Sequence, residues 1–283
     1  MRRTSAIAHY TVAAAIEALG SDAAKLATEG WRLGIVFCAM SGCVNFSRRF
    51  CDEMLKDPST ASPLLFPETV FNAPASHLSA VLGTPALYYT LVGDPGTFLQ
   101  GVALAADWLS TDKVDGCLVL GAEEQDWLVA EAFQLFDPQG IVSEGAGALY
   151  LRRDSQRAPG VELRAVSQPY LFSGHASRTE AARRARNDLA GEPPGALLCD
   201  SRQGLPRLDE AENQAWSDWS GHRLSPKVVC GDGLMAGAAW QCVAAVDALA
   251  ASDYPVANVS IVGHNEQAIA AQFVRAASAQ KAR

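Results

Sequence analysis

Residues 88–109 (YYTLVGDPGTFLQGVALAADWL) combine the patterns of a strand, a sharp turn and a helix. In many enzymes such a turn carries a nucleophile, because it exposes the side chain while the unpaired N–H groups of the helix lower a thiol pKa or stabilise an anion. Here the turn, residues 93–97, reads GDPGT and contains neither Ser nor Cys. Asp94 suits a helix N-cap and Pro95 the first helical position. The turn therefore predicts a helix start rather than covalent chemistry.

Two acidic residues follow apolar segments in the second half of the chain. Asp200 follows residues 196–199, and Asp232 comes shortly after residues 227–230, which begin with Lys227. Two carboxylates in one pocket would suit hydrolysis or proton transfer. Acidic residues at strand ends more commonly cap a helix or pair with a cation such as Lys227, so the sequence leaves both interpretations open.

The remaining candidate groups favour structural roles. His77 lies between apolar neighbours, a setting more typical of a structural histidine than of a catalytic base. Cys38, Cys43 and Cys51 are the only remaining candidates for a nucleophile, but no histidine motif accompanies them, so we expect them to pack in the interior. The chain has 7 cysteines and no C-x-x-C pair, which fits buried thiols in a reducing cytosol better than disulfides or a zinc site.

Composition narrows the class of protein. Of the 283 residues, 49% are hydrophobic and 19% charged, as in an ordinary globular protein, and no apolar run reaches membrane-spanning length. No secretory signal is visible near the first residue, and the net charge of −8 argues against partners such as nucleic acid or an anionic membrane. We therefore expect a cytoplasmic protein without a cofactor or a metal.

Strand and helix patterns alternate along the chain, which predicts stacked α/β layers. Polar residues 154–159 mark a junction between two halves. We expect helices at residues 4–20, 42–56, from 72 onward, 98–109, 126–136, 179–189 and 236–250. Strands are expected at residues 33–38, 88–92 (buried), 114–120, 146–152, 161–171, 196–199, 227–230 and 256–262, with 269–274 closing the sheet.

Several motifs in one order resemble the β-ketoacyl synthases of the thiolase superfamily, the carbon–carbon bond-forming enzymes of fatty-acid and polyketide synthesis. Residues 72–79 (NAPASHLS) are similar to their N-x-x-x-x-H-[IL]-[AS] helix, and Tyr89-Thr90 to the strand that enters the catalytic turn. Residues 121–124 (GAEE) are similar to their G-[GA]-x-E motif, and 143–148 (SEGAGA) to G-E-G-A-G-[AV].

The resemblance implies a thiolase-like layered α-β-α-β-α fold built from two related halves, residues 1–155 and 156–283. In these relatives a first strand and a long segment precede the helix that residues 4–20 resemble. We therefore expect the N-terminal part to be shortened, with the loss of a strand that is central in the relatives unless the true start lies upstream.

The sequence departs from the family motifs at each of the three catalytic positions. Pro95 stands where the relatives carry the catalytic Cys, Asp200 where their first His belongs, and Asp232 where their second His belongs, although the Lys of that motif is matched by Lys227. Condensation needs a thiolate and two neutral imidazoles, whereas proline cannot be acylated and carboxylates would repel the developing negative charge. The ordinary reaction is therefore expected to be absent. The residues expected around a possible pocket are Asp94, Gly96, His77 and His264, the last of these at the position of a glycine-rich loop.

Two functions are consistent with these residues. One is a non-catalytic, chain-length-factor-like partner that pairs with an active ketosynthase and shapes its acyl tunnel, as in type II polyketide and aryl-polyene systems. The other is an enzyme of altered chemistry on acyl thioesters, a hydrolase or an acyltransferase, that uses Asp200 and Asp232. The first implies a heterodimer with a ketosynthase, or a homodimer, and indirect contact with an acidic acyl carrier protein. A basic patch for such a carrier could be formed by Arg178, Arg183, Arg184 and Arg186, although a solvated helix face is the simpler interpretation.

Overall fold

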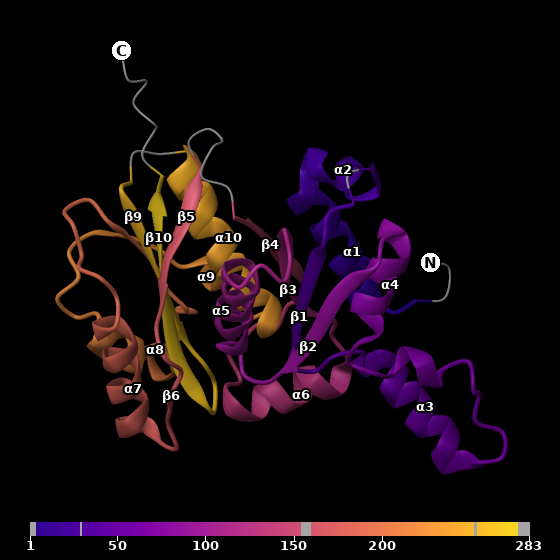
Figure 1. Cartoon of the computed structure of the whole chain (residues 1–283). Coiled ribbons are helices and arrows are strands. Elements are labelled where there is room, and N and C mark those ends of the chain that lie inside the picture. Colours follow the sequence, from indigo (N-terminus) through magenta and orange to yellow (C-terminus); the bar gives the residue numbers. More distant parts are fainter. Residues whose placement is uncertain (1–3, 29, 154–159, 252–253, 277–283) are drawn as a thin grey trace.

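The computed structural model describes residues 4–28, 30–153, 160–251 and 254–276, so the predicted junction at residues 154–159 lies outside the described part. Two mixed sheets stand side by side with helices α5 and α10 between them, and further helices cover their outer faces (Figure 1). The predicted α-β-α-β-α layering is therefore present.

The N-terminal half contains a four-stranded sheet. Its strands are β1 (Leu33–Ala39), β2 (Ala86–Val92), β3 (Gly116–Glu123) and β4 (Gly145–Arg152). Its helices are α1 (Ala6–Leu19), η1 (Gly20–Asp22), α2 (Ala23–Thr28), α3 (Val44–Lys56), η2 (Phe66–Glu68), α4 (Ala73–Leu82), α5 (Thr97–Ser110) and α6 (Trp127–Phe136).

The C-terminal half contains a six-stranded sheet. Its strands are β5 (Val161–Val166), β6 (Tyr170–Leu171), β7 (Leu197–Cys199), β8 (His222–Leu224), β9 (Val256–Val262) and β10 (Gln267–Arg275). Its helices are α7 (His175–Asn187), α8 (Pro206–Ala215), α9 (Pro226–Cys230) and α10 (Met235–Ala251).

The two sheets repeat one topology. In the first, the order is β2-β1-β3-β4, with β1 parallel to β2 and β3, and β3 antiparallel to β4. In the second, β8-β7-β9-β10 has the same sequence of parallel and antiparallel pairs, and β5 is added beyond β10. The matching order relates β4 to β10 and β2 to β8.

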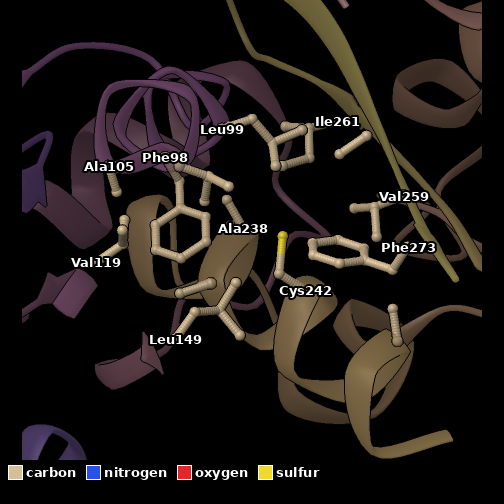
Figure 2. Close-up of a cluster of buried hydrophobic side chains, with 14 of the residues drawn as sticks. Phe98, Leu99, Ala105, Val119, Leu149, Ala238, Cys242, Val259, Ile261 and Phe273 are labelled. Carbon is tan, nitrogen blue, oxygen red and sulfur yellow. The ribbon is translucent and has the colours of Figure 1, made fainter. Parts of the chain in front are cut away.

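The main core lies between the two sheets. Phe98 and Leu99 of α5 and Cys242 of α10 pack there against Val259 and Phe273 of the C-terminal sheet (Figure 2). Small residues let the layers approach closely, since a Cβ at Gly121 would lie 2.7 Å from the Met235 carbonyl oxygen of α10. This close packing fixes the position of the turn before α5 relative to the C-terminal half.

Three strand predictions were wrong. Residues 227–230 form α9 instead of a strand, because Pro226 pre-sets a helical φ at the first helical position. Residues 161–171 form two strands, β5 and β6, which both pair with β10. For that reason β10 does not close the sheet but lies inside it.

Two predictions about position were also wrong. Strand β2 is a half-exposed edge strand, not a buried one, and its Tyr89 is 55% exposed. The predicted central gap is also absent from the described sheet: β1 pairs directly with β3, and the one strand without a described counterpart in the N-terminal half, β5, lies at the edge of its sheet. Two further elements, α8 and β8, were not predicted from the sequence, because α8 is polar and β8 is short.

Candidate functional site

The turn between β2 and α5 is built as a helix start. The Asp94 carbonyl accepts the Thr97 N–H at 2.8 Å, and the helix begins at Thr97 with Gly96 as its N-cap. Pro95 is buried at this turn. The prediction of Asp94 as the N-cap was wrong, because its carboxylate points to another part of the chain.

The Asp94 carboxylate holds the loop between β9 and β10. It is 5% exposed and accepts backbone N–H groups from His264 (3.0 Å), Glu266 (3.0 Å) and Gln267 (3.2 Å). A Cβ at Gly263 would lie 1.9 Å from an Asp94 carboxylate oxygen, so this position requires glycine. The turn that should present a nucleophile instead joins the two halves.

Asp232 is the centre of a buried charge cluster. It is fully buried, and its Oδ2 atom accepts from Gln203 Nε2 (2.6 Å) and Lys227 Nζ (3.2 Å), while its Oδ1 accepts the Leu234 N–H (2.8 Å). Burial alone would raise the pKa of Asp232, but attraction to the Lys227 ammonium and the hydrogen bonds from His264 and the Leu234 N–H hold it far below its usual value. Asp232 is therefore an anion at neutral pH.

His264 brings an imidazole into this cluster from the β9–β10 loop. Its Nε2 lies 2.8 Å from Asp232 Oδ2, and its Nδ1 lies 4.0 Å from Asp94 Oδ1. The ring packs edge-on against Phe133, and Nδ1 is buried without a hydrogen-bond partner among the described residues. His264 thus lies between the two carboxylates, next to the turn that contains Pro95.

Asp200 lies in a separate ionic arrangement. Its buried carboxylate accepts from Arg202 Nε (2.8 Å), Arg223 Nη1 (3.2 Å) and Ser225 Oγ (2.5 Å). Asp200 and Asp232 are each neutralised by their own cations, and no hydrogen bond joins them in the described structure. The geometry therefore does not form the carboxylate pair that hydrolysis would use, and it favours the pairing of Asp232 with Lys227.

The thiols near the turn are poor nucleophiles. Cys38 Sγ lies 3.9 Å from the Thr97 carbonyl oxygen, but the side chain is fully buried, and burial raises its pKa far above the ordinary value. Burial likewise raises the pKa of Cys43 to about 12. Cys51, expected inside, is exposed on α3.

His77 and the arginines of α7 lie apart from the charge cluster or are engaged elsewhere. His77 Nε2 contacts the Glu68 carboxylate at 2.9 Å, in agreement with a structural role. Arg186 pairs with Glu192 and Asp218. Other α7 arginines stack on aromatic rings or contact an acid: Arg184 on Tyr170, Arg178 on Phe172 and Arg183 beside Glu180.

Sequence reasoning missed the hydrogen-bond partners that complete the site. Gln203 and Gln267 lie in loop or strand segments, and a neutral amide side chain gives no catalytic signal of its own in a sequence. In residues 4–28, 30–153, 160–251 and 254–276, no group of three or more His, Cys, Asp and Glu could hold a metal ion. Across the same ranges, no helix has the length and apolarity needed to cross a membrane.

Neither a family model nor a curated protein matches the sequence. Several solved structures, however, match the fold of the chain. The ishigamide ketosynthase/chain length factor aligns at 20% identity with a TM-score of 0.70, over 86% of this chain and 73% of that one. A type II polyketide acyl carrier protein in complex with its ketosynthase (AntDE:AntF) aligns at 15% identity and a TM-score of 0.79, over 96% and 83%.

A third structure is the ketosynthase ApeO in complex with its chain length factor ApeC from Xenorhabdus doucetiae. It aligns at 13% identity and a TM-score of 0.72, over 92% of this chain and 79% of that one. At these identities the likeness establishes the fold. The chain has the thiolase-like fold of ketosynthases and chain length factors, which confirms the predicted fold class.

Proposed function

We propose that this chain is a non-catalytic, chain-length-factor-like subunit that pairs with an active ketosynthase. The observation that carries the proposal is the buried Pro95 at the turn where a condensing enzyme needs its nucleophile. A proline has no group that can accept an acyl chain. The nearby Cys38 thiol is fully buried and its pKa is raised, so it does not replace the missing cysteine.

The charge cluster supports the same conclusion. Decarboxylation of an extender unit creates negative charge that a condensing enzyme stabilises with neutral imidazoles. By the motif resemblance, Asp232 stands where one of these imidazoles belongs, and here it is an anion that is hydrogen-bonded to His264. The polar groups at this site join the two halves of the chain by hydrogen bonds, as expected of a subunit with a structural role.

An exposed apolar surface on the N-terminal half suits a partner subunit. We define the partner face as the edge strand β2 together with α3 and η2. Its exposed apolar side chains include Leu55, Phe66, Tyr88, Tyr89 and Val92. Helix α3 projects away from the rest of the chain (Figure 1). Edge strands with uncharged side chains are normally covered, and a ketosynthase of the same fold could extend the sheet here.

The arginines of α7 bear on where an acyl carrier protein would dock. Carrier proteins are generally acidic, but the guanidinium of Arg186 is already neutralised by Glu192 and Asp218. The net charge of this chain is −8, which would also repel an acidic carrier. We therefore place the carrier on the ketosynthase subunit, with indirect contact to this chain.

Co-expression with a co-encoded ketosynthase tests the proposal. We expect a stable complex with equal numbers of the two chains, and condensation by that complex but not by this chain alone. A Pro95→Cys variant in complex with an inactivated ketosynthase should remain inactive, because Asp232 stays anionic. Condensation by the isolated wild-type chain would refute the proposal.

The alternative of altered acyl-thioester chemistry has one observation in its favour, the His264–Asp232 contact at 2.8 Å. A hydrolase would use such a dyad to activate water. The decisive measurement is thioesterase activity of the isolated chain on an acyl thioester. Activity that disappears in Asp232→Asn and His264→Gln, while both variants stay folded, would establish the alternative.

A further inference from the structure

Helix α3 belongs to the partner face, but the core of the chain does not hold it in place. None of its described residues, 44–56, is buried, and the helix projects from the body of the molecule (Figure 1). Its aromatic contact with η2, in which the rings of Phe50 and Phe66 lie 5.7 Å apart, stays within the partner face. Most helices are fixed by burial of an apolar face. The position of α3 must instead depend on polar contacts at its base.

Glu124 joins the first turns of two helices through one carboxylate. Its Oε1 accepts the Asn45 N–H of α3 at 2.9 Å, and its Oε2 accepts the Ile7 N–H of α1 at 3.1 Å. A negative charge is favourable at both positions, because the N–H groups of a first helical turn carry partial positive charge. Ile7 is itself fully buried in the N-terminal core. Glu124 therefore ties the exposed helix α3 to a helix that the core holds.

The residues beside Glu124 hold the same end of α3. They belong to the segment 123–126 (EEQD), which begins at the last residue of β3. Three further contacts from this segment reach the turn before α3 or the start of the helix: Glu123 Oε2 with the Ser41 N–H (3.0 Å), the Gln125 carbonyl with Asn45 Nδ2 (3.0 Å), and Asp126 Oδ2 with Arg48 Nε (2.6 Å). Four consecutive residues therefore fix the base of α3.

We propose that the segment 123–126 positions α3 for the ketosynthase, with Glu124 as the main positioning residue. The inference rests on the proposed function, because it takes the partner face as the binding surface. Glu124 is fully buried and cannot touch a partner, so it acts through α3. With α3 held, the exposed side chains of Leu55 and Phe66 keep a fixed place in the partner face, and less ordering is required on binding.

Two natural cysteines can report the position of α3. Cys51 on α3 and Cys230 on α9 are exposed, whereas the other cysteines of the chain are buried. Spin labels on this pair should give one narrow distance distribution in the isolated wild-type chain. Arg48→Ala breaks the bond to Asp126, and it should make the distribution at least about twice as broad, because one of the contacts that fix the base of α3 is lost.

Arg49→Ala is the matched control for this measurement. Arg49 pairs with Glu53 inside α3, at 3.5 Å, so its loss should leave the distribution narrow. Binding of the co-expressed ketosynthase is then compared by interferometry. Glu124→Ala, which removes the contacts with both helices, should weaken binding about tenfold, and Arg48→Ala about threefold. Glu212→Gln, a change at a buried glutamate of the C-terminal half, should leave binding unchanged.

The outcomes separate this inference from the proposed function. Arg48 is partly exposed, so its variant should fold even if Glu124→Ala does not. A narrow distribution in every folded variant overturns the inference. Weaker binding by Arg48→Ala with an unchanged distribution also overturns it, because the arginine would then contact the ketosynthase directly. Failure of the wild-type chain to bind a ketosynthase would instead refute the proposed function, whatever the distances are.

Discussion

The two halves of the molecule share a topology but differ in what their sheet edges expose. In the C-terminal half, β5 pairs antiparallel with residues 271–275 of β10, with one shift of register between Gln272 and Phe273. In the N-terminal half, β2 presents exposed Tyr88 and Tyr89, and β4 has no strand beyond it in the described residues. The two halves therefore share a fold but not the surface of their sheet edges, and the exposed apolar edge strand, β2, lies in the N-terminal half.

The charged groups around the turn before α5 are divided in the opposite way. The Lys227–Asp232 and Asp200 ion pairs belong to the C-terminal half, and the N-terminal half contributes one carboxylate, Asp94, to that region. In an active condensing enzyme, the two halves would meet at a nucleophile and its imidazoles. Here the Asp94 carboxylate of one half accepts backbone N–H groups from the β9–β10 loop of the other.

The largest expected effect is on ketosynthase binding, and it should distinguish edge strand β2 of the N-terminal half from β5 of the C-terminal half. Tyr89→Lys places a charge on the exposed edge strand β2 and should weaken binding of the co-expressed ketosynthase at least about 100-fold, since interface aromatics commonly act as hot spots. The matched change Glu162→Lys lies on β5, the outer strand of the other half, and should leave binding unchanged. Co-purification and interferometry measure both. Equal binding by the two variants would place the ketosynthase elsewhere.

The next effect concerns stability of the C-terminal half. Asp232→Ala leaves Lys227 buried without its partner and should lower the free energy of unfolding by about 3–5 kcal/mol. The control Asp52→Ala removes an exposed i,i+4 pair with Arg48 and should cost less than about 0.5 kcal/mol. Urea unfolding compares the two. A similar small loss in both variants would show that the cluster contributes little to stability.

One added methyl group should disrupt the contact between the Asp94 carboxylate and the β9–β10 loop, which joins the two halves. Gly263→Ala forces the Asp94 carboxylate away from the three N–H groups that it accepts, which should cost on the order of 3 kcal/mol. Gly174→Ala is the control, because a Cβ there meets nothing within 4 Å. Thermal unfolding should show a clearly lower midpoint for Gly263→Ala alone.

Much of the fold could be predicted from local patterns. The strands at residues 33–38 and 256–262 are continuous apolar runs, and their structures confirm the prediction. The apolar run of β2 gave the wrong burial, because apolar composition alone does not distinguish a central strand from an edge strand. The segment 227–230 has the composition of a strand but forms α9, because Pro226 sets a helical φ at the first helical position.

The site could be predicted only in part, for a similar reason. Sequence motifs brought Pro95 and Asp232 to attention, but the partners of these residues come from distant segments. His264 is 32 residues from Asp232, and its backbone N–H meets Asp94 at a separation of 170 residues. No local pattern contains such contacts. They arise only when the two halves pack through α5 and α10.

The smallest expected effect compares two buried glutamates, one in each half. Burial, and then the charge of Asp200, raise the pKa of Glu212 from its ordinary 4.5 to about 8, and its Oε1 has no hydrogen-bond partner among the described residues. A folded-state pKa above the unfolded one means that the folded chain holds the proton more tightly, so stability falls as pH rises from 4.5 to 8. Glu212→Gln removes this ionisation and should stabilise the chain by about 1–2 kcal/mol at pH 8.5 relative to pH 5.5.

Glu123 of the N-terminal half should respond differently, although burial raises its pKa to about 7. Both of its carboxylate oxygens accept backbone N–H groups, from Met40 and Ser41. The amide of Glu123→Gln would turn a donor toward one of those donors, so this variant should lose about 1–3 kcal/mol at both pH values. Urea unfolding of both variants at pH 5.5 and 8.5 decides the matter. A gain at high pH in both would mean that ionisation, not hydrogen-bond geometry, dominates at each site.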